Sequence, residues 1–313
     1  MNFMGEEEIS SFLGENYAIE FDGADVLRDG PDNLVWVFEK GGEKKYVVRI
    51  SKRDIRDGID FEIEWLTFLA GKNMPVVPPI ETNGGRGYAI TPTGSIITVF
   101  PFVNGKHIVA SGSEPKKPIV LNAAVALAKI HNASRNRTAH AKRKRTIFSE
   151  LERAISHKRR IEEKMSGGTW LMSEVEEYLA WGRGERYNPV LVHNDYRPGN
   201  ILVGDNNEIV AVLDFDWSCM GPAAKDVGHA LAEWSYPDGA AEHSKGTFTA
   251  FLDEYNKATD EKIKSPDNLA RWIAFSCLSD TCTYLVDRLE RGEIKNPDDS
   301  YMYQKFRYFS KKQ

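Results

Sequence analysis

The hydrophobic pattern divides the chain into a β-rich first third and a helical remainder. Residues 34–40 (LVWVFEK) and 44–51 (KKYVVRIS) alternate apolar and polar positions on either side of Gly41 and Gly42. This alternation around two glycines predicts a β-hairpin. The apolar stretch 87–103 predicts two further strands around a turn.

Helical spacing in the same part of the chain predicts two helices. Residues 6–17 begin with three glutamates, an acidic first turn that suits a helix N-terminus. Apolar residues within 59–69 recur at helical spacing, and the pattern stops at Gly71, with Pro75 just beyond. Together these elements predict a small antiparallel sheet of about five strands with one main helix packed on it.

Beyond Val103 the helical period dominates, apart from one hairpin. Residues 200–203 and 208–215 are the strong β signals of this part, and they flank the turn 204–207. The boundary near 102–107 predicts an N-terminal domain of residues 1–103 and a C-terminal domain of residues 104–313, which is an α+β architecture with two lobes. Helices are expected at 120–133, 148–165, 173–182, 223–234, 246–258, 265–290 and 297–309.

The composition is that of an ordinary globular protein, with 41% hydrophobic and 28% charged residues. No apolar run is long enough to cross a bilayer, and Met1–Ser10 is acidic rather than a basic segment followed by an apolar one. A cytoplasmic protein without membrane association is therefore expected. The three cysteines, Cys219, Cys277 and Cys282, are expected to be reduced thiols in the core.

The charge is unevenly distributed. A net charge of -5 argues against a general nucleic-acid-binding protein, yet residues 135–164 hold eleven Lys or Arg against four Glu, including the run KRKR at 142–145. This segment is either a solvated basic face or a site for an anionic partner. No aromatic platform accompanies it, so nucleic acid is not the expected partner.

The segment LVHNDYRPGNILV, residues 191–203, sets a polar loop directly before the predicted hairpin. Antiparallel pairing places Asn200 opposite Val212, and Asp214 lies two residues further on the same face, because side chains alternate with period two. Asn200 and Asp214 should therefore converge at the open end of the hairpin, which Asp195 also enters. We expect their side-chain oxygens within about 5 Å of each other or of a shared Mg²⁺.

These carboxylate and amide oxygens predict a chemistry. An all-oxygen set suits Mg²⁺, which is usually held by one or two carboxylates together with substrate phosphates, so a nucleotide site is indicated. Asp195 is separated from the hairpin by the loop. It can accept a hydrogen bond from an incoming hydroxyl and serve as the general base.

At this point the residues match a family. HNDYRPGN, followed after a hairpin by LDFDW, resembles the H-x-D-x-x-x-x-N and D-x-D signatures of the aminoglycoside phosphotransferase and choline kinase superfamily, which is related more distantly to protein kinases. The resemblance implies a bilobal protein-kinase-like fold that uses ATP or GTP with Mg²⁺. It also implies that His193 orders the catalytic loop, while Asp214, Asn200 and Asp216 surround the metal.

The same resemblance implies roles for residues elsewhere in the chain. Asp226 resembles the aspartate that braces the catalytic loop, although a plain N-terminal helix acid has the same appearance. Arg49 stands where Lys is commoner and would bind nucleotide phosphates, paired with Glu62 or, failing that, Glu64. Three residues of the stretch 100–103 should line the base pocket, namely Phe100, Phe102 and Val103, and the turn 28–33 resembles the loop that covers the phosphates.

The predicted activity is transfer of a γ-phosphoryl group to a hydroxyl of a small polar molecule that bears an amine, such as an aminoglycoside, homoserine or a choline-like alcohol. Two alternatives stay open: a Ser/Thr protein kinase of the bacterial stress-response type, and a non-catalytic nucleotide-binding protein with a kinase fold. The intact Asp195, Asn200 and Asp214 argue against the second alternative. Acidic residues available to an amine are Glu233, Asp238, Glu242, Asp253 and Asp280.

Overall fold

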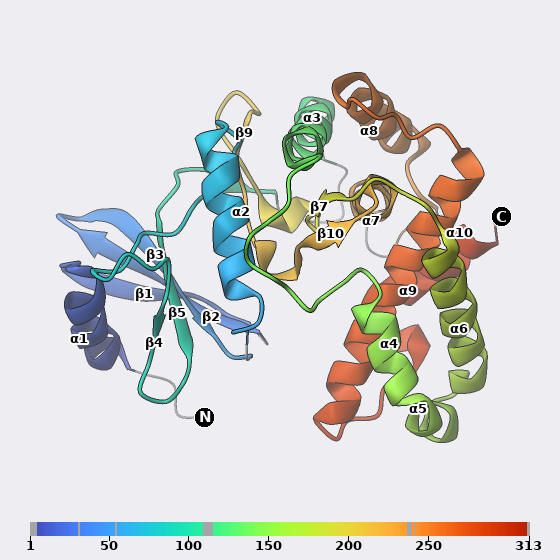
Figure 1. The fold of residues 1–313 in the computed structure, drawn as a ribbon, viewed down its shortest axis with the longest axis horizontal. Coiled ribbons are helices and arrows are strands. Elements are labelled where there is room, and N and C mark those ends of the chain that lie inside the picture. The colour runs from blue at the N-terminus through green and yellow to red at the C-terminus, as the bar shows by residue number, and fades with distance from the viewer. Residues whose placement is uncertain are drawn as a thin grey trace. The chain divides into compact units, whose positions relative to one another are not determined.

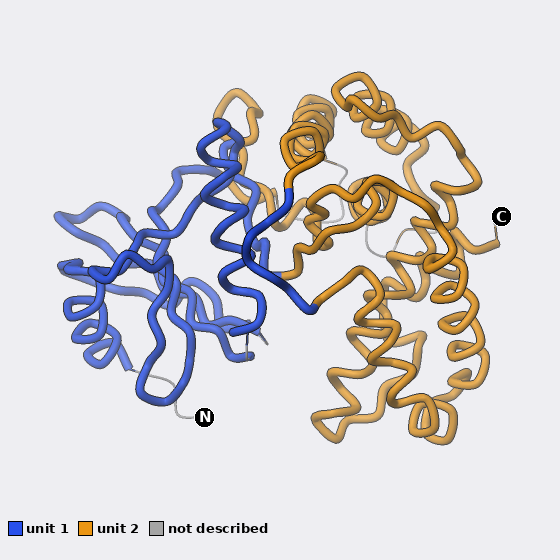
Figure 2. Tube along the Cα trace, viewed as in Figure 1, with its two compact units in different colours: residues 1–105, 138–144, 210–216 blue, residues 106–137, 145–209, 217–313 orange. Residues whose placement is uncertain are grey.

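The computed structural model describes residues 5–30, 32–53, 55–108, 115–236, 240 and 242–311. Contacts between residues divide the chain into two compact units (Figure 2). Unit 1 consists of residues 1–105, 138–144 and 210–216, and unit 2 consists of residues 106–137, 145–209 and 217–313. Two short segments from later in the chain therefore belong with the N-terminal unit.

Unit 1 is built on a five-stranded sheet with the order β1-β2-β3-β5-β4 (Figure 1), in which all neighbouring strands are antiparallel. The predicted hairpin is β2 and β3, and both turn glycines, Gly41 and Gly42, have positive φ angles of 65° and 76°, which other residues disfavour. The strands are β1 Gly23–Asp29, β2 Asn33–Lys40, β3 Glu43–Ser51, β4 Ala89–Ile90 and β5 Ile96–Pro101.

The alternation of side chains along β3 gives the sheet two different faces. Val48 and Ile50 point to the face covered by helix α1 (Glu6–Tyr17), where they join the apolar core of this unit. Arg49, between them in sequence, points to the opposite face. There it meets Glu62 of helix α2 (Ile59–Gly71), so the sheet separates an apolar core from a charged site.

The two later segments of unit 1 are attached by backbone contacts. The carboxylate of Glu64, on α2, accepts hydrogen bonds from the backbone N–H groups of His140 and Ala141 at 3.0 and 2.8 Å. The N–H of Val212 donates to the carbonyl of Pro75 at 2.7 Å. These bonds bring residues 138–144 and 210–216 into the unit that carries Arg49.

Unit 2 is mainly helical, with α9 at the centre of its packing. Helix α9 packs against α4, α7 and α10, and the side chain of Ser265 caps it by accepting from the N–H of Asn268. Its helices are α3 Lys117–Ser134, α4 Ser149–Ser156, α5 Lys158–Lys164, α6 Gly168–Gly184, α7 Ala223–Ser235, α8 Lys245–Ala258, α9 Pro266–Glu290 and α10 Tyr301–Ser310.

Short strands and single turns support the loops between these helices. Strand β10 (Cys219–Gly221) pairs with β7 (Val190–Val192), and a three-stranded sheet has the order β6-β8-β9. The remaining short elements are β6 Lys106–His107, β8 Ile201–Val203, β9 Ile209–Val212 and the 3₁₀ turns η1 Pro198–Asn200, η2 Phe215–Trp217 and η3 Pro297–Asp299.

The sequence pattern and the structure differ in several elements. The helix predicted over 148–165 is two helices that break at His157. Leu151 is buried in the first of these helices and Ile161 in the second. The patterns for β1, β6, β7 and β10 were missed.

The fold class predicted from the sequence is confirmed: unit 1 holds an antiparallel sheet and unit 2 is mainly helical. Cys219, Cys277 and Cys282 are buried free thiols, as predicted. Among the described residues, no helix has the length and apolar character needed to span a membrane.

Close packing between α7 and α9 gives a test of this arrangement. A Cβ atom added at Gly228 would lie 2.9 Å from backbone atoms of Trp272 and Ile273. We expect Gly228→Ala to lower the free energy of unfolding by about 1–3 kcal/mol, measured by urea denaturation. Gly246→Ala in α8 is the control, because a Cβ atom added there would be 4.0 Å from Ser244 Oγ, its nearest contact beyond its chain neighbours and its own helix backbone; an equal loss in both variants would contradict the packing.

Candidate active site

The loop 193–200 connects β7 with β8 and is held by a buried carboxylate. Asp226, in the first turn of α7, accepts hydrogen bonds from the backbone N–H groups of His193 and Asn194 at 2.7 and 2.8 Å. Asp226 and His193 are completely buried. Asp226 thus satisfies two backbone donors of a loop that has no strand partner at this point.

Two residues that the sequence interpretation did not identify hold Asp226 in place. His131 of α3 lies with Nε2 3.1 Å from Asp226 Oδ2, and its Nδ1 is 2.7 Å from the hydroxyl of Tyr255 on α8. Burial raises the pKa of Asp226, but the hydrogen bond and charge of His131, with the charges of His193 and Lys225, lower it below its ordinary value of 3.8. The carboxylate is therefore ionised at neutral pH.

Asp195 is oriented by Asn200 and Arg197. The amide of Asn200 donates to Asp195 Oδ2 at 2.7 Å and to its backbone carbonyl at 2.9 Å. Arg197 places Nε 3.2 Å from Oδ1 of the same carboxylate. The amide N–H groups of Asn200 are turned toward Asp195. The side-chain Oδ1 of Asn200 is therefore the atom that remains for a metal ion. His193 Nδ1 accepts from the N–H of Asp195 at 3.3 Å.

Asn194 shows why its position tolerates few residues. Its φ angle is 71°, in the left-handed region that glycine and asparagine adopt most readily. Its amide donates to the carbonyl of Trp217 at 3.2 Å and accepts from the ammonium of Lys225. The left-handed backbone and the two contacts of its amide therefore account for Asn at this place without reference to a substrate.

His229 and Asp280 extend the site from α7 to α9, and neither was assigned a catalytic role from the sequence. His229 Nε2 lies 2.9 Å from Asp280 Oδ2 and 4.0 Å from Asp195 Oδ1. Burial lowers the pKa of His229, but the carboxylates of Asp280 and Asp195 outweigh burial and raise it above 6.5. The imidazole of His229 therefore lies between the carboxylates of Asp280 and Asp195.

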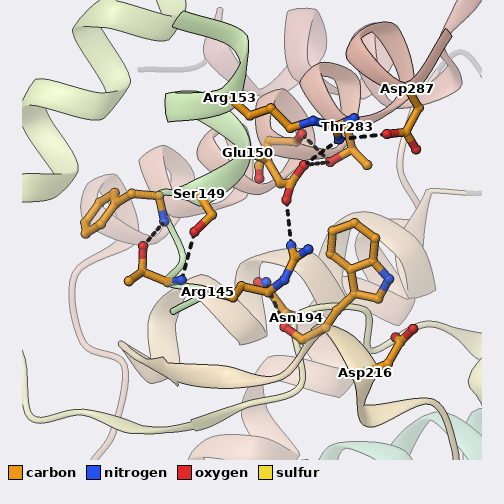
Figure 3. A network of polar contacts seen from close by, with 12 residues as sticks. Arg145, Ser149, Glu150, Arg153, Asn194, Asp216, Thr283 and Asp287 are labelled. Carbon is orange, nitrogen blue, oxygen red and sulfur yellow. Dashed lines mark hydrogen bonds and ion pairs between the residues drawn. The ribbon is translucent and has the colours of Figure 1, made fainter. Parts of the chain in front are cut away.

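A pocket of about 380 Å³ in unit 2 opens beside Asp195. Its wall includes carboxylates from α4, α9 and η3, and Glu150 is tied to Arg145, Arg153 and Thr283 (Figure 3). Such a pocket can take a small polar molecule. The lining residues are Glu150, Asn194, Asp195, Arg197, Trp217, Ser279, Asp280, Thr283, Tyr284, Asp299, Ser300, Tyr301 and Met302.

The acidic residues suggested for an amine divide into different situations. Asp280 lines this pocket, whereas Glu233 forms an ion pair with Lys305 at 2.8 Å. Glu242 and Asp253 are not among the residues of its wall. Asp238 lies outside the described residues. Asp280 is thus the one of the suggested acids that the described structure places beside Asp195.

In unit 1, Arg49 and Glu62 form a buried bidentate ion pair with distances of 2.8 and 2.9 Å. Burial lowers the pKa of Arg49, but Glu62 and the carboxylates of Asp216 and Asp214 raise it overall. The Arg49 guanidinium also lies 5.4 Å from the ring centre of Phe100 on β5. Glu64, the alternative partner, is instead bound to backbone N–H groups of residues 140 and 141.

Asp214 and Asp216 lie next to each other, and Arg49, Arg53 and Arg143 are the cations near Asp216. Burial raises the pKa of Asp216, but Arg49 and Arg53, a hydrogen bond with Asp214, and Arg143 lower it below 3.8. Arg53 approaches Asp216 Oδ2 at 3.2 Å, while the buried Oδ1 has no hydrogen-bond partner within the described ranges. Adjacent carboxylates with an unsatisfied oxygen fit Mg²⁺, which needs one or two carboxylates when phosphates complete its shell.

The predicted site residues therefore fall into two sets. His193, Asp195, Asn200 and Asp226 lie together in unit 2, and the second set lies in unit 1: Arg49, Glu62, Phe100, Asp214 and Asp216. The close approach of Asn200 to Asp214 stays a prediction. No three His, Cys, Asp or Glu side chains within the described ranges form a group that could hold a metal ion.

Of the residues expected at the base pocket, Phe100 lies in β5, and Phe102 and Val103 follow that strand. The N–H of Phe102 donates to the carbonyl of Lys45 at 2.8 Å, and the ammonium of Lys44 lies 5.8 Å from the Phe102 ring centre. Val103 is partly buried. The stretch 28–33 expected to form the phosphate-covering turn includes the end of β1 and the first residue of β2, and its Pro31 is outside the described residues.

Comparison with known proteins assigns the chain to a class. Residues 24–260 match the model of the phosphotransferase enzyme family, so the chain belongs to this family of small-molecule phosphotransferases. A search of curated proteins found no match.

Solved structures share the kinase-like fold at low sequence identity. An amicoumacin kinase in complex with AMP-PNP, Ca²⁺ and Ami is 15% identical, with a TM-score of 0.74 over 99% of this chain and 93% of that one. A spectinomycin phosphotransferase with ADP and spectinomycin is 16% identical, with a TM-score of 0.67 over 99% and 95%. Choline kinase from Cryptosporidium parvum is 15% identical, with a TM-score of 0.67 over 98% and 95%.

The brace at Asp226 has a defined pH dependence. Asp226→Asn should lower the free energy of unfolding by about 2–3 kcal/mol at pH 7, because a charged acceptor of two N–H groups is lost. The pKa of Asp226 is lowered by folding, so its stabilisation is complete above the ordinary value of 3.8 and is lost as the pH falls toward the folded-state pKa.

Urea denaturation of both proteins between pH 7 and pH 2.5 measures this effect. The difference between wild type and Asp226→Asn should be constant above about pH 5 and should narrow below about pH 4. A difference that stays constant across the whole range would show that folding does not lower the pKa of Asp226.

Proposed function

We propose that this protein is a phosphotransferase that uses ATP or GTP with Mg²⁺. It transfers the γ-phosphoryl group of the nucleotide to a hydroxyl of a small polar molecule that bears an amine. The observation that carries the proposal is the carboxylate of Asp195. It is oriented by Asn200 and Arg197 at the wall of a pocket that also contains Asp280. A hydroxyl in this pocket can donate to Asp195.

Each group has a defined part in the transfer. The acceptor oxygen attacks the γ-phosphorus, the bond to the bridging oxygen of the diphosphate breaks, and the hydroxyl proton passes to Asp195. Arg49, fixed by Glu62, binds phosphate oxygens of the nucleotide. Asp214, Asp216 and Asn200 would hold Mg²⁺, which supplies electrostatic stabilisation of the phosphoryl group when bound.

The proposed function assigns nucleotide binding and catalysis to different parts of the chain. In this proposal residues 1–103 form the nucleotide-binding lobe, in which Phe100, Phe102 and Val103 line the pocket for the purine base. Residues 104–313 form the catalytic and acceptor-binding lobe. Asp214 and Asp216 come from the later sequence but belong by their contacts to unit 1, with Arg49.

An acceptor screen tests the activity. ADP release should be measured with ATP or GTP and Mg²⁺ in the presence of kanamycin, spectinomycin, choline, L-homoserine, simple sugars and a generic protein substrate. Release that depends on one small molecule supports the proposal. Labelled phosphate that appears only on this protein or on the protein substrate would instead indicate a protein kinase.

The role of Asp195 has a quantitative test. Asp195→Ala should abolish transfer and leave the affinity for Mg·AMP-PNP nearly unchanged, measured by isothermal titration calorimetry. Asp205→Ala is the control, because its side chain is 88% exposed in the hairpin turn. If Asp195→Ala keeps more than about one hundredth of the wild-type rate, the low end of what a positioned base contributes, Asp195 is not the base.

The amine in the acceptor is tested at Asp280. Asp280→Asn should raise KM for a cationic acceptor about tenfold, because it removes one charge-assisted contact, and should leave kcat nearly unchanged. Asp253→Asn, at an exposed aspartate outside the pocket, should change neither constant. An unchanged KM in Asp280→Asn would show that Asp280 does not bind the acceptor amine.

A further inference from the structure

The basic run KRKR at 142–145 has two kinds of residue. Lys142 and Lys144 are exposed, whereas Arg143 and Arg145 are partly buried. The segment is not helical, and exposure alternates from one residue to the next along it. The run is therefore not a uniform basic surface, and its two arginines have partners of their own.

Arg143 occupies a fitted place in unit 1. Its guanidinium donates to the backbone carbonyl of Asp216 and lies 5.7 Å from the ring centre of Phe61. It also lies against Gly58, where an added Cβ atom would be 3.0 Å from Arg143 Nε and 3.2 Å from Nη2. A glycine, an aromatic ring and a carbonyl thus surround this one guanidinium.

The carbonyl that Arg143 holds belongs to a turn with a constrained backbone. Asp214 has a φ angle of 67°, in the left-handed region that residues other than glycine seldom adopt. The chain then forms the 3₁₀ turn η2. Conformations of this kind persist where the surrounding structure holds them. Arg143 provides such a contact directly beside the two carboxylates assigned to Mg²⁺.

Arg145 has corresponding partners in unit 2. Its guanidinium lies 4.0 Å from the ring centre of Trp217, a stacking distance, and 2.6 Å from Glu150 Oε1. Figure 3 shows Arg145 directed at Glu150, which Arg153 and Thr283 approach from the other side. Trp217 and Glu150 both line the pocket beside Asp195, so Arg145 supports two parts of its wall.

We propose that Arg143 and Arg145 are positioning residues of the phosphotransfer site: Arg143 holds the metal-binding turn at Asp216, and Arg145 holds the Trp217 ring and the Glu150 carboxylate in the wall of the acceptor pocket. This inference rests on the proposed function for the roles of the turn and the pocket. The exposed Lys142 and Lys144 serve neither part, and they supply matched controls from the same run.

The first test measures Mn²⁺ binding in the presence of AMP-PNP by electron paramagnetic resonance. Removing a cation near a metal site should by charge alone tighten Mn²⁺ binding. Positioning has the opposite sign: Arg143→Gln should weaken Mn²⁺ binding about tenfold, because a charge-assisted hydrogen bond to the turn is lost. Arg143→Lys, which keeps a donor and the charge, should restore part of the affinity.

The second test observes Trp217 directly. In protein labelled with 5-fluorotryptophan, the Trp217 resonance is assigned with Trp217→Phe. Arg145→Gln should shift this resonance and increase its relaxation by a soluble gadolinium chelate, because the stacked guanidinium is removed. Arg145→Lys should restore the resonance only in part, since an ammonium keeps the ion pair with Glu150 but not planar stacking.

Substitutions of Arg143 and Arg145 should have different effects in these two tests. Arg143→Gln should shift the 5-fluoro-Trp217 resonance less than Arg145→Gln does, because Arg143 holds the carbonyl of the Asp216–Trp217 peptide while Arg145 stacks on the Trp217 ring itself. Arg145→Gln should leave Mn²⁺ affinity within about twofold of wild type, because Arg143 still holds the turn. With the most active compound of the acceptor panel, Arg145→Gln should raise KM more than it lowers kcat. Lys142→Gln and Lys144→Gln should change none of these quantities.

Defined results overturn the inference. Tighter or unchanged Mn²⁺ binding in Arg143→Gln would show that Arg143 does not hold the turn. An unchanged Trp217 resonance in Arg145→Gln would show that Arg145 does not hold the ring. Urea denaturation of each variant separates these effects from unfolding. If no compound of the panel is phosphorylated, the proposed function fails while the Mn²⁺ and fluorine measurements still decide this inference.

Discussion

The buried carboxylate of Asp226 is the interaction on which the candidate active site depends. A loop between two short strands has backbone N–H groups that no strand can accept, and a buried N–H without a partner is costly. Asp226 accepts two of them, from His193 and Asn194. The N–H of Asn194, whose backbone is left-handed, is one of these two donors. A single carboxylate therefore fixes the path of the loop immediately before Asp195.

Helix α7 carries both Asp226, which holds the loop, and His229, which lies near the Asp195 carboxylate. Asp226 and His229 are three residues apart, so they lie on neighbouring positions of one helix face. The first holds the loop backbone, and the second lies 4.0 Å from the Asp195 carboxylate and 2.9 Å from Asp280 on α9. Because α7 packs directly on α9 at Gly228, the loop, the imidazole and the pocket carboxylate are placed by one helix pair.

Local patterns in the sequence predicted much of the fold and part of the site. The hairpin of β2 and β3, helix α2 and the capped start of α9 have strong local signals, and the spacing of HNDYRPGN indicated Asp195 and Asn200 as candidate site residues. Strand β1 was missed because it lies at the sheet edge, where Val26 and Leu27 are exposed. Such a strand lacks the alternation of burial on which strand prediction depends.

Partners that are distant in sequence could not be predicted in the same way. Helical periodicity can indicate that His131 is buried, but its partners Asp226 and Tyr255 lie 95 and 124 positions away. The pairing of His229 with Asp280 likewise depends on how α7 packs on α9. Helix packing chooses these contacts, and a single sequence records the residues without recording which of them meet.

The basic run shows a different limit, because there the relevant signal is local but concerns the type of cation. Counting charge treats Arg and Lys alike, and it predicted only a basic segment. A guanidinium is planar and can stack on an aromatic ring while it donates in its own plane, whereas an ammonium is compact and strongly hydrated. A segment that alternates Lys and Arg therefore gives its cations different surroundings: Lys142 and Lys144 are exposed, and the guanidinium groups of Arg143 and Arg145 meet Asp216, Trp217 and Glu150.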